Sequence, residues 1–353
     1  MNLNDASSFV QLDTQNMLSQ INGLPAQLMS AWRLGLNQEL PEWSDIRQVL
    51  IAGMGGSAIG ADLLASYVAR YSSVPIIVHR DYDLPAWAHG SDTLVIASSH
   101  SGNTEETISA FDAAKNSECS CLVISTGGKL AQRAIEFGDP VWIFKHDGQP
   151  RAAVGFSFGL LLAVLVKMQL VPDQEEALNK AVATMQKQQS QLFPDVPVAR
   201  NLAKRLAGQL IGRWVTVFGS GSLAPVARRW KGQISEIAKA WSQFEFLPES
   251  DHNTLAGIKN PESLLSSMMV LFLRSSTGHP RNLVRSDLTR KSFMLEGLNT
   301  DFVDAMGDSP LENLWTCLHL GDYVSYYLAM AYGVDPTPVE AIENFKVELL
   351  AEE

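Results

Sequence analysis

Residues that could form disulfides or bind metal ions are scarce in this sequence. The 353 residues include three cysteines, Cys119, Cys121 and Cys317. They are too few and too unevenly spaced for a disulfide framework. No second ligand pair accompanies Cys119 and Cys121, and metal-binding patterns such as H-x-H or H-E-x-x-H are missing. We therefore expect buried, reduced thiols and no metal-dependent chemistry.

Long basic runs and long apolar runs are also missing. There are 27 Lys and Arg residues against 38 Asp and Glu, so the formal net charge is −11. This balance does not favour nucleic acid or an anionic membrane as a partner. The N-terminal residues lack the pattern of a signal peptide, and no later segment reaches the roughly 18 apolar residues of a membrane span. These absences predict a cytoplasmic protein.

What the sequence does contain, in its first part, is a series of short apolar runs that alternate with helical stretches. The runs cover residues 48–54, 75–80, 93–99, 121–125 and 140–144. Near-continuous apolar strands separated by helices are typical of a parallel sheet with both faces covered. A helical pattern over residues 14–38, which Gly23 and Pro25 interrupt, precedes the first strand.

The same pattern returns after a polar, glutamine-rich helix near residues 173–192. WVTVFGSGSLAPVARRWKGQ at 214–233 repeats the strand, Gly/Ser loop and helix of QVLIAGMGGSAIGADLL at 48–64. A second apolar strand and two helices complete this copy, at 264–274, about 280–297 and about 310–332.

This repetition, together with the chain length, indicates two domains rather than one. We predict an α/β protein of two tandem, doubly wound domains, each a mainly parallel sheet flanked by helices. The predicted domains cover residues 1–152 and 153–353.

A polar loop over residues 98–104 joins one of the apolar strands to a helix that begins near Glu105. Its side chains include the hydroxyl groups of Ser99, Ser101 and Thr104. These hydroxyls would lie beside the free N–H groups of a helix N-terminus, whose dipole favours anions, so the loop is a candidate phosphate site. The alternative is structural, because Ser and Thr are also common N-caps and turn formers.

A glycine-rich loop follows the first strand and reaches the same edge of the predicted sheet. It contains Gly55, Gly56 and Ser57, and its small residues let the backbone approach a ligand. A dinucleotide site fits poorly, because the third glycine of that pattern is replaced by Ala58. Acidic residues do occur about 20 positions further on, but they follow basic His79 and Arg80. We therefore expect a phosphate group rather than a dinucleotide at this edge.

At this point the sequence resembles the bifunctional phosphoglucose/phosphomannose isomerases of the sugar isomerase (SIS) domain superfamily. The resemblance spans nearly the whole chain. It rests on GMGGSAIG at 53–60, SHSGNTEET ending at Thr107, Pro150-Arg151, QISEIAKAW followed by PESDHNTLAG, and PVEAIENFK near the C-terminus.

The resemblance implies an activity and a set of roles. A member of this family would interconvert a phosphorylated aldose and ketose through a cis-enediol, as a homodimer without metal or cofactor. Phosphate would be held by Ser57, Ser99, Ser101 and Thr104. Glu236 would transfer the proton, and Arg151 would stabilise the enediolate. His252, from the neighbouring subunit, and Lys346 would open the sugar ring.

The sequence around Glu236 and Lys346 can also be weighed without the resemblance. A helix around residues 222–241 carries an apolar stripe, and Glu236 lies outside it in a row with Gly232 and Ala240. That row leaves room for a ligand, although a solvated helix glutamate would satisfy the same spacing. Lys346 falls within the apolar face of the C-terminal helix. Its ammonium group either passes over that face into water or enters a polar cavity.

His252 and Arg151 carry weaker signals of their own. His252 lies in a polar turn, where a surface histidine is the ordinary interpretation, and only its interval of sixteen residues from Glu236 fits the family. Arg151 follows Pro150 at the predicted domain junction, where ligands often bind. An arginine there could equally bridge carboxylates.

One residue departs from the family pattern. Seven residues before Lys346 stands Val339, where members of the family carry threonine. A valine cannot hydrogen-bond to water or sugar, so the sequence predicts a hexose phosphate isomerase but leaves its action on mannose 6-phosphate open. The remaining alternative is a non-catalytic sugar-phosphate sensor, in which Glu236 would be dispensable. A sensor would more naturally carry a DNA-binding module, and the two predicted domains leave no length for one.

Overall fold

Two parallel β-sheets organise the protein, and they are described here from a computed structural model covering residues 2–43 and 45–352. The first sheet contains five strands in the order β2-β1-β3-β4-β5. The strands are β1 (Gln48–Ala52), β2 (Ile76–His79), β3 (Thr93–Ser99), β4 (Ser120–Ser125) and β5 (Val141–Ile143). Each lies where the apolar runs predict a strand.

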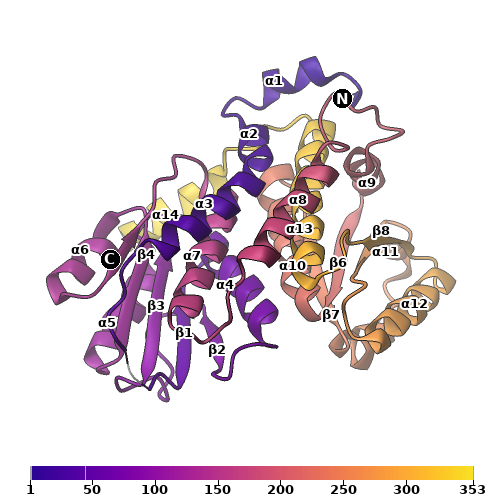
Figure 1. Ribbon diagram of the computed structural model, residues 1–353. Coiled ribbons are helices and arrows are strands. Elements are labelled where there is room, and N and C mark those ends of the chain that lie inside the picture. The colour runs from indigo at the N-terminus through magenta and orange to yellow at the C-terminus, as the bar shows by residue number, and fades with distance from the viewer. Residues whose placement is uncertain (1, 44, 353) are drawn as a thin grey trace.

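Helices cover both faces of this sheet (Figure 1). One face packs against α3 (Leu24–Leu36), α4 (Gly55–Val68) and α7 (Val154–Lys167). The other packs against α5 (Glu105–Asn116) and α6 (Gly128–Phe137). Neighbouring residues of one strand enter opposite cores, as Ile96 and Val95 of β3 do. Burial on both faces is why these strands are apolar without alternation.

The second sheet repeats the winding of the first with one strand fewer. Its order is β7-β6-β8-β9, and all its strands are parallel. They are β6 (Trp214–Ser220), β7 (Ser242–Leu247), β8 (Met268–Arg274) and β9 (Asn299–Asp304). The predicted fold class is confirmed, and β6 and β8 take the places that β1 and β3 hold in the first sheet. Strand β9 has no counterpart in the predictions, because its residues NTDFVD lack an apolar run.

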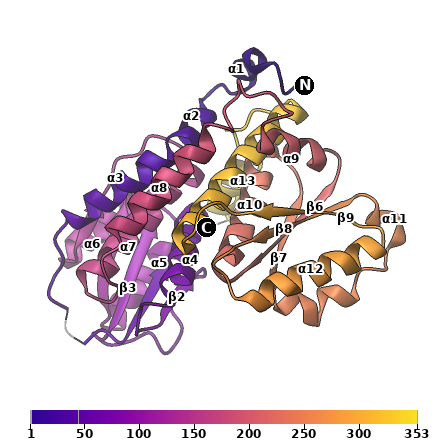
Figure 2. The same cartoon turned by 45° about the vertical axis from the view of Figure 1, so that its right-hand side comes forward.

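A long central helix joins the two halves. Helix α13 (Pro310–Tyr332) is buried over most of its length and packs on α8 (Glu175–Gln189), α9 (Leu202–Leu210) and α10 (Ala224–Ala238). Figures 1 and 2 both show it between the two sheets. Helix α12 (Pro280–Leu295) lies on the opposite face of the second sheet. The helices predicted near 280–297 and 310–332 are therefore confirmed as α12 and α13.

The remaining helices are short or peripheral: α1 (Phe9–Leu12), α2 (Met17–Asn22), α11 (Glu262–Leu265) and α14 (Glu340–Ala351). Helix α7 begins directly after the predicted boundary at residue 152, yet it packs on α3 and α4 beside the first sheet. The division into 1–152 and 153–353 remains a proposal.

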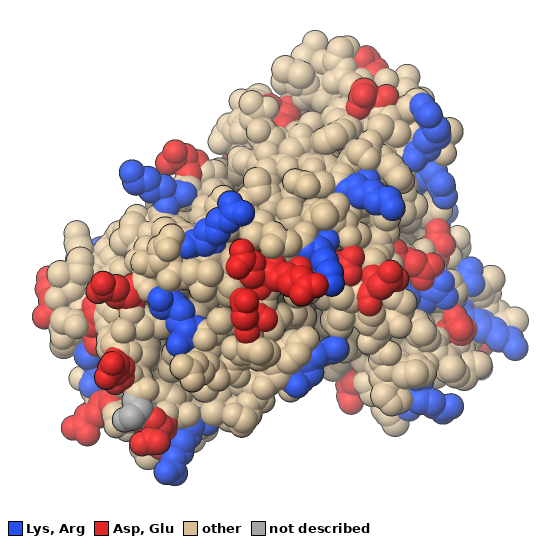
Figure 3. Space-filling model, viewed as in Figure 1, with Lys and Arg blue, Asp and Glu red and all other residues tan. Residues whose placement is uncertain are grey.

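The surface and the thiols bear on the predictions from composition. On the face shown in Figure 3, Lys and Arg side chains are scattered among Asp and Glu and form no continuous basic area. No helix among the described residues is long and apolar enough to cross a membrane. All three cysteines are free and buried, as expected.

Candidate active site at the junction of the two domains

The serine-rich loop after β3 is held in shape by its own hydroxyl groups. Ser99 is buried, and its Oγ accepts a hydrogen bond from the Gly102 N–H at 3.1 Å. The hydroxyls of Ser99 and Thr104 hydrogen-bond to each other at 2.9 Å. Ser101 is exposed, and helix α5 begins at Glu105 without a side-chain cap. Ser99 thus shapes the loop, while Ser101 and the first turn of α5 are available to an anion.

Glycines allow the glycine-rich loop after β1 to pack closely against its neighbours. A Cβ atom on Gly53 would lie 2.7 Å from the Ser98 carbonyl oxygen. One on Gly56 would lie 2.6 Å from the Pro150 carbonyl oxygen and 3.4 Å from Cα of Arg151. Only glycine permits both approaches. The two predicted phosphate-binding segments and the segment that carries Arg151 therefore meet at the carboxyl edge of the first sheet.

A histidine pair that the sequence analysis did not single out lies at this meeting point. Nε2 of His100 is 3.0 Å from Nδ1 of His146, so the pair links the serine-rich loop to the segment before Arg151. Both rings pack edge-on against phenylalanines, His100 on Phe144 and His146 on Phe156. Burial and, after it, the neighbouring His146 lower the pKa of His100 to about 4.

This pair should make the fold sensitive to acid. Because the folded pKa of His100 lies below its unfolded value, the unfolded chain binds the proton more readily, so stability is lost as the pH falls from about 6.5 toward about 4. We expect the melting temperature of His100→Gln to fall less than that of the unmodified chain between about pH 7 and about pH 5. His89→Gln, at an exposed histidine, is the control. An equal fall in the melting temperature of all three proteins would contradict the assignment of this acid sensitivity to His100.

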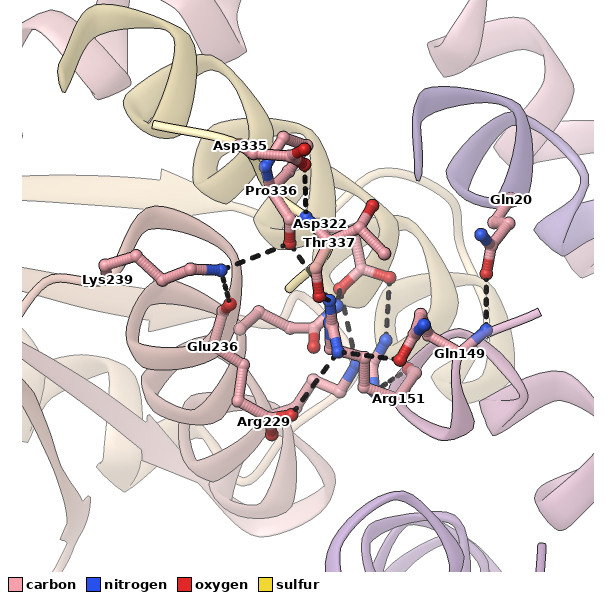
Figure 4. A network of polar contacts seen from close by, with 11 residues as sticks. Gln20, Gln149, Arg151, Arg229, Glu236, Lys239, Asp322, Asp335, Pro336 and Thr337 are labelled. Carbon is pink, nitrogen blue, oxygen red and sulfur yellow. Dashed lines mark hydrogen bonds and ion pairs between the residues drawn. The ribbon is translucent and has the colours of Figure 1, made fainter. Parts of the chain in front are cut away.

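Arg151 occupies the centre of a polar network (Figure 4). It belongs to the short helix η2 (Pro150–Ala152), and its side chain is only 4% exposed. Its Nη2 donates to the carbonyl oxygens of Pro336 and Thr337, at 2.9 and 2.5 Å. Its Nη1 lies 3.8 Å from Oε2 of Glu236. The arginine therefore joins the first domain to the candidate base and to the loop before α14.

A buried ion pair holds this network in place. Arg229 of α10 forms two hydrogen bonds with Asp322 of α13, at 3.2 and 2.9 Å, and donates to the carbonyl oxygen of Arg151 at 2.8 Å. Gln233, one turn along α10, also donates to Asp322 at 2.9 Å. Helix α10, which carries Glu236, is thereby fixed against α13 and against the backbone of Arg151.

Glu236 lies near the end of α10, with its side chain 33% exposed. The predicted apolar stripe of this helix is buried, except for Trp241, which is 69% exposed. The reason is that α10 ends at Ala238 and Lys239 turns the backbone into the left-handed region, with φ of 54°. Trp241 and Ala240 consequently lie beyond the helix. The predicted row of Gly232, Glu236 and Ala240 is thus wrong at its last member, and Glu236 stands in the last turn.

His252 and Lys346 lie on exposed segments of the single chain. His252 ends the short helix η4 (Glu249–His252) and is exposed, next to Asp251, which accepts from Arg285 at 2.7 Å. Lys346 is exposed on α14. Burial lowers the pKa of Arg151, and the charge of Glu343, one turn before Lys346, opposes part of that lowering. In the part of the chain that the structure describes, no hydrogen bond or ion pair joins His252 or Lys346 to the other predicted residues.

The candidate site does not coincide with the larger of the two cavities described here. One cavity, with a volume of about 230 Å³, lies in the second domain between the sheet and residues 254–265. Its wall is mostly apolar, and none of the predicted site residues lines it. A much smaller cavity, of about 10 Å³, lies where Gly56, Ser57, Ser98, His100 and Pro150 converge. We place the candidate site by its chemistry, at the smaller cavity and the adjoining Arg151 network.

Sequence reasoning missed several residues of this network. Arg229, Asp322, Lys239 and the loop over residues 335–337 all contact it. Asp322 offered one signal, because a carboxylate in the middle of the apolar helix α13 must have a buried partner. Nothing in the local sequence indicates that the partner is Arg229 rather than its neighbour Arg228.

The sequence matches a known family over its C-terminal part. The matching family is the bacterial phospho-glucose isomerase C-terminal SIS domain, over residues 199–349. A bifunctional phosphoglucose/phosphomannose isomerase from Caldicellulosiruptor bescii is 39% identical over 94% of this chain and 98% of the relative. An enzyme of the same name from Aquifex aeolicus is 33% identical over 87% of this chain and 94% of its own length.

Solved structures show the same architecture at lower identity. The tagatose-6-phosphate ketose/aldose isomerase from Escherichia coli aligns with a TM-score of 0.66, covering 91% of this chain and 94% of that chain. Its sequence is 18% identical, so this likeness concerns the fold alone.

Proposed function

The chain belongs to the family of bifunctional phosphoglucose/phosphomannose isomerases, and we propose that it is an aldose–ketose isomerase that interconverts glucose 6-phosphate and fructose 6-phosphate. The observation that carries the proposal is the contact between Arg151 and Glu236, whose charged atoms lie 3.8 Å apart, with the backbone of Arg151 packed against the glycine-rich loop. A carboxylate and a cation so placed are what proton transfer through an anionic enediolate requires.

The proposed reaction uses only the side chains and backbone N–H groups of the protein. Ser101, Thr104 and the first turn of α5 hold the phosphate, with Ser57 at the start of α4 beside them and Ser99 shaping the loop. In the direction from aldose to ketose, Glu236 removes the proton from C2 and returns it to C1 through a cis-enediol; in the reverse direction it removes the proton from C1 and returns it to C2. Arg151 stabilises the oxygen that gains negative charge in that step. His252 and Lys346 assist ring opening.

The exposed position of His252 supports a shared active site. We propose a homodimer in which His252 of one subunit completes the site of the other. A His252→Ala protein mixed with a Glu236→Gln protein should then regain activity, because each hybrid dimer contains one intact site. Complete exchange makes half of the dimers hybrids, so about a quarter of the unmodified activity is expected. Each variant alone is the control, and no recovery after verified exchange would contradict the shared site.

The phosphate loop can be tested by its hydroxyl groups. Ser101→Ala and Thr104→Ala should each raise KM for the sugar phosphate by about tenfold or more, since each removes a hydrogen bond to a charged group worth roughly 1.5–3 kcal/mol. The far-ultraviolet circular dichroism should not change. The unphosphorylated sugar is the control ligand. A variant that binds this sugar more weakly by the same factor as it binds the sugar phosphate would contradict the assignment.

The activity itself is tested with fructose 6-phosphate. We expect glucose 6-phosphate to form at the same rate with and without a chelator. Binding of the sugar phosphate without turnover would favour the sensor instead. Mannose 6-phosphate is measured in the same samples, and comparison with Val339→Thr shows whether this valine limits that second product.

We also propose a cytoplasmic location, which suits the three free, buried thiols.

A further inference from the structure

Lys239 ends helix α10 in a conformation that is costly for lysine. Its φ of 54° and ψ of 30° lie in the left-handed region, where Gly or Asn ordinarily ends a helix. A side chain with a Cβ atom is sterically strained in that region. The consequence for the active site is direct, because this turn places the Lys239 side chain back over the last turn of the helix, where Glu236 stands.

Lys239 is exposed, but its ammonium group points toward the site network (Figure 4). Its Nζ donates to the main-chain oxygen of Glu236 at 2.6 Å and to that of Pro336 at 3.4 Å. The Pro336 oxygen is also bound by Nη2 of Arg151 at 2.9 Å. Two cations from different elements therefore share one carbonyl group of the loop before α14.

These contacts close a ring around the candidate base. Arg151 contacts the Glu236 carboxylate, Lys239 holds the Glu236 backbone, and both cations bind Pro336. A lysine that only capped the helix would need the first carbonyl contact alone. The second contact fixes the distance between the end of α10 and the loop.

We propose that Lys239 is a positioning residue for the proton transfer, which holds the end of α10 and the 335–337 loop together so that Glu236 faces Arg151 and the C1–C2 bond of the sugar. This inference rests on the proposed function. Lys239 acts through Glu236, whose main-chain oxygen it binds.

The charges around Lys239 give the inference a signature in the pH profile. The groups that face its ammonium are Arg151, Glu236 and Asp335. Partial burial and, after it, the charge of Arg151 lower the pKa of Lys239 to about 8, against the opposing effect of the two carboxylates. Lys239 should thus lose its proton at about pH 8, and kcat should fall as the pH rises through that value.

Two substitutions and a matched control test the proposal. Lys239→Met should lower kcat by about 10- to 100-fold, the order of loss expected when a reacting group is displaced by about 1 Å, while KM changes little. The decline of kcat above about pH 8 should disappear. Lys239→Arg keeps the charge and should retain most of kcat, with the alkaline decline moved to about pH 10 or above. Lys231→Met, on the same helix, should behave as the unmodified chain.

The outcomes separate this inference from the proposed function. An unmodified chain without isomerase activity overturns both. If the unmodified chain is active, a Lys239→Met protein with unchanged kcat and the same alkaline decline overturns the role of Lys239 alone. Should Lys239→Met fail to fold, the Lys239→Arg profile decides, because an alkaline decline that stays at about pH 8 contradicts the proposal.

Discussion

Glu236→Gln is expected to reduce kcat by about 10²- to 10⁴-fold, the usual cost of losing a general base. Glutamine keeps the shape of the side chain and its reach toward Arg151, but it cannot accept the proton that moves between C1 and C2. The contacts that fix the backbone of Glu236 come from its carbonyl group, through Lys239, and remain in the variant. KM should therefore change little. Steady-state kinetics with fructose 6-phosphate measure both quantities.

A second glutamate provides the control for this loss. Glu175→Gln removes an exposed carboxylate from the first turn of α8, and we expect it to leave kcat unchanged. A Glu236→Gln protein with more than a tenth of the unmodified kcat would show that another group is the base. The helix α10 would then position the substrate without taking part in the proton transfer.

Arg229→Met should destabilise the protein by about 3–5 kcal/mol, because it leaves the Asp322 carboxylate buried without its cation. The side chains of this pair are only 3% and 4% exposed. The same change removes the hydrogen bond to the Arg151 carbonyl, so activity should fall even at temperatures where the variant is folded. Urea unfolding, followed by tryptophan fluorescence, measures the loss of stability.

The adjacent arginine on α10 is a matched control. Arg228 pairs with Asp62 at 3.3 Å, but its side chain is 42% exposed, and Arg80 also pairs with that carboxylate. Arg228→Met should therefore cost about 1 kcal/mol or less. Equal losses for Arg228→Met and Arg229→Met would mean that the Arg229–Asp322 pair does not anchor the site.

The sequence predicts the fold well because both sheets are covered on both sides. Strands buried in this way must be apolar throughout, so β1, β3 and β4 are apparent from composition alone. Strand β9 is the exception, because a strand without an apolar run cannot be recognised from the sequence in this way. It lies at the edge of the second sheet, only Val303 within it is buried, and so its sequence carries no apolar run.

The site was predictable only where the local sequence carries the chemistry. The serine-rich loop could be found because a hydroxyl-rich turn before a helix is itself an anion site. Arg151 and Glu236 are 85 positions apart in the sequence, and their contact depends on how α10 packs on α13. The end of α10 could not be predicted from the sequence either, because neither Gly nor Pro occurs there. The left-handed turn occurs at Lys239, whose side chain makes the contacts that a helix-ending glycine could not.

The source of the hydrogen on C2 of the aldose product tests the central claim most directly. We propose to incubate the unmodified chain with fructose 6-phosphate in deuterium oxide and to follow the products by proton NMR. The account predicts glucose 6-phosphate with solvent deuterium at C2, and no such product with Glu236→Gln. Aldose that forms at the unmodified rate with Glu236→Gln, or that never carries deuterium at C2, would contradict proton transfer by this carboxylate.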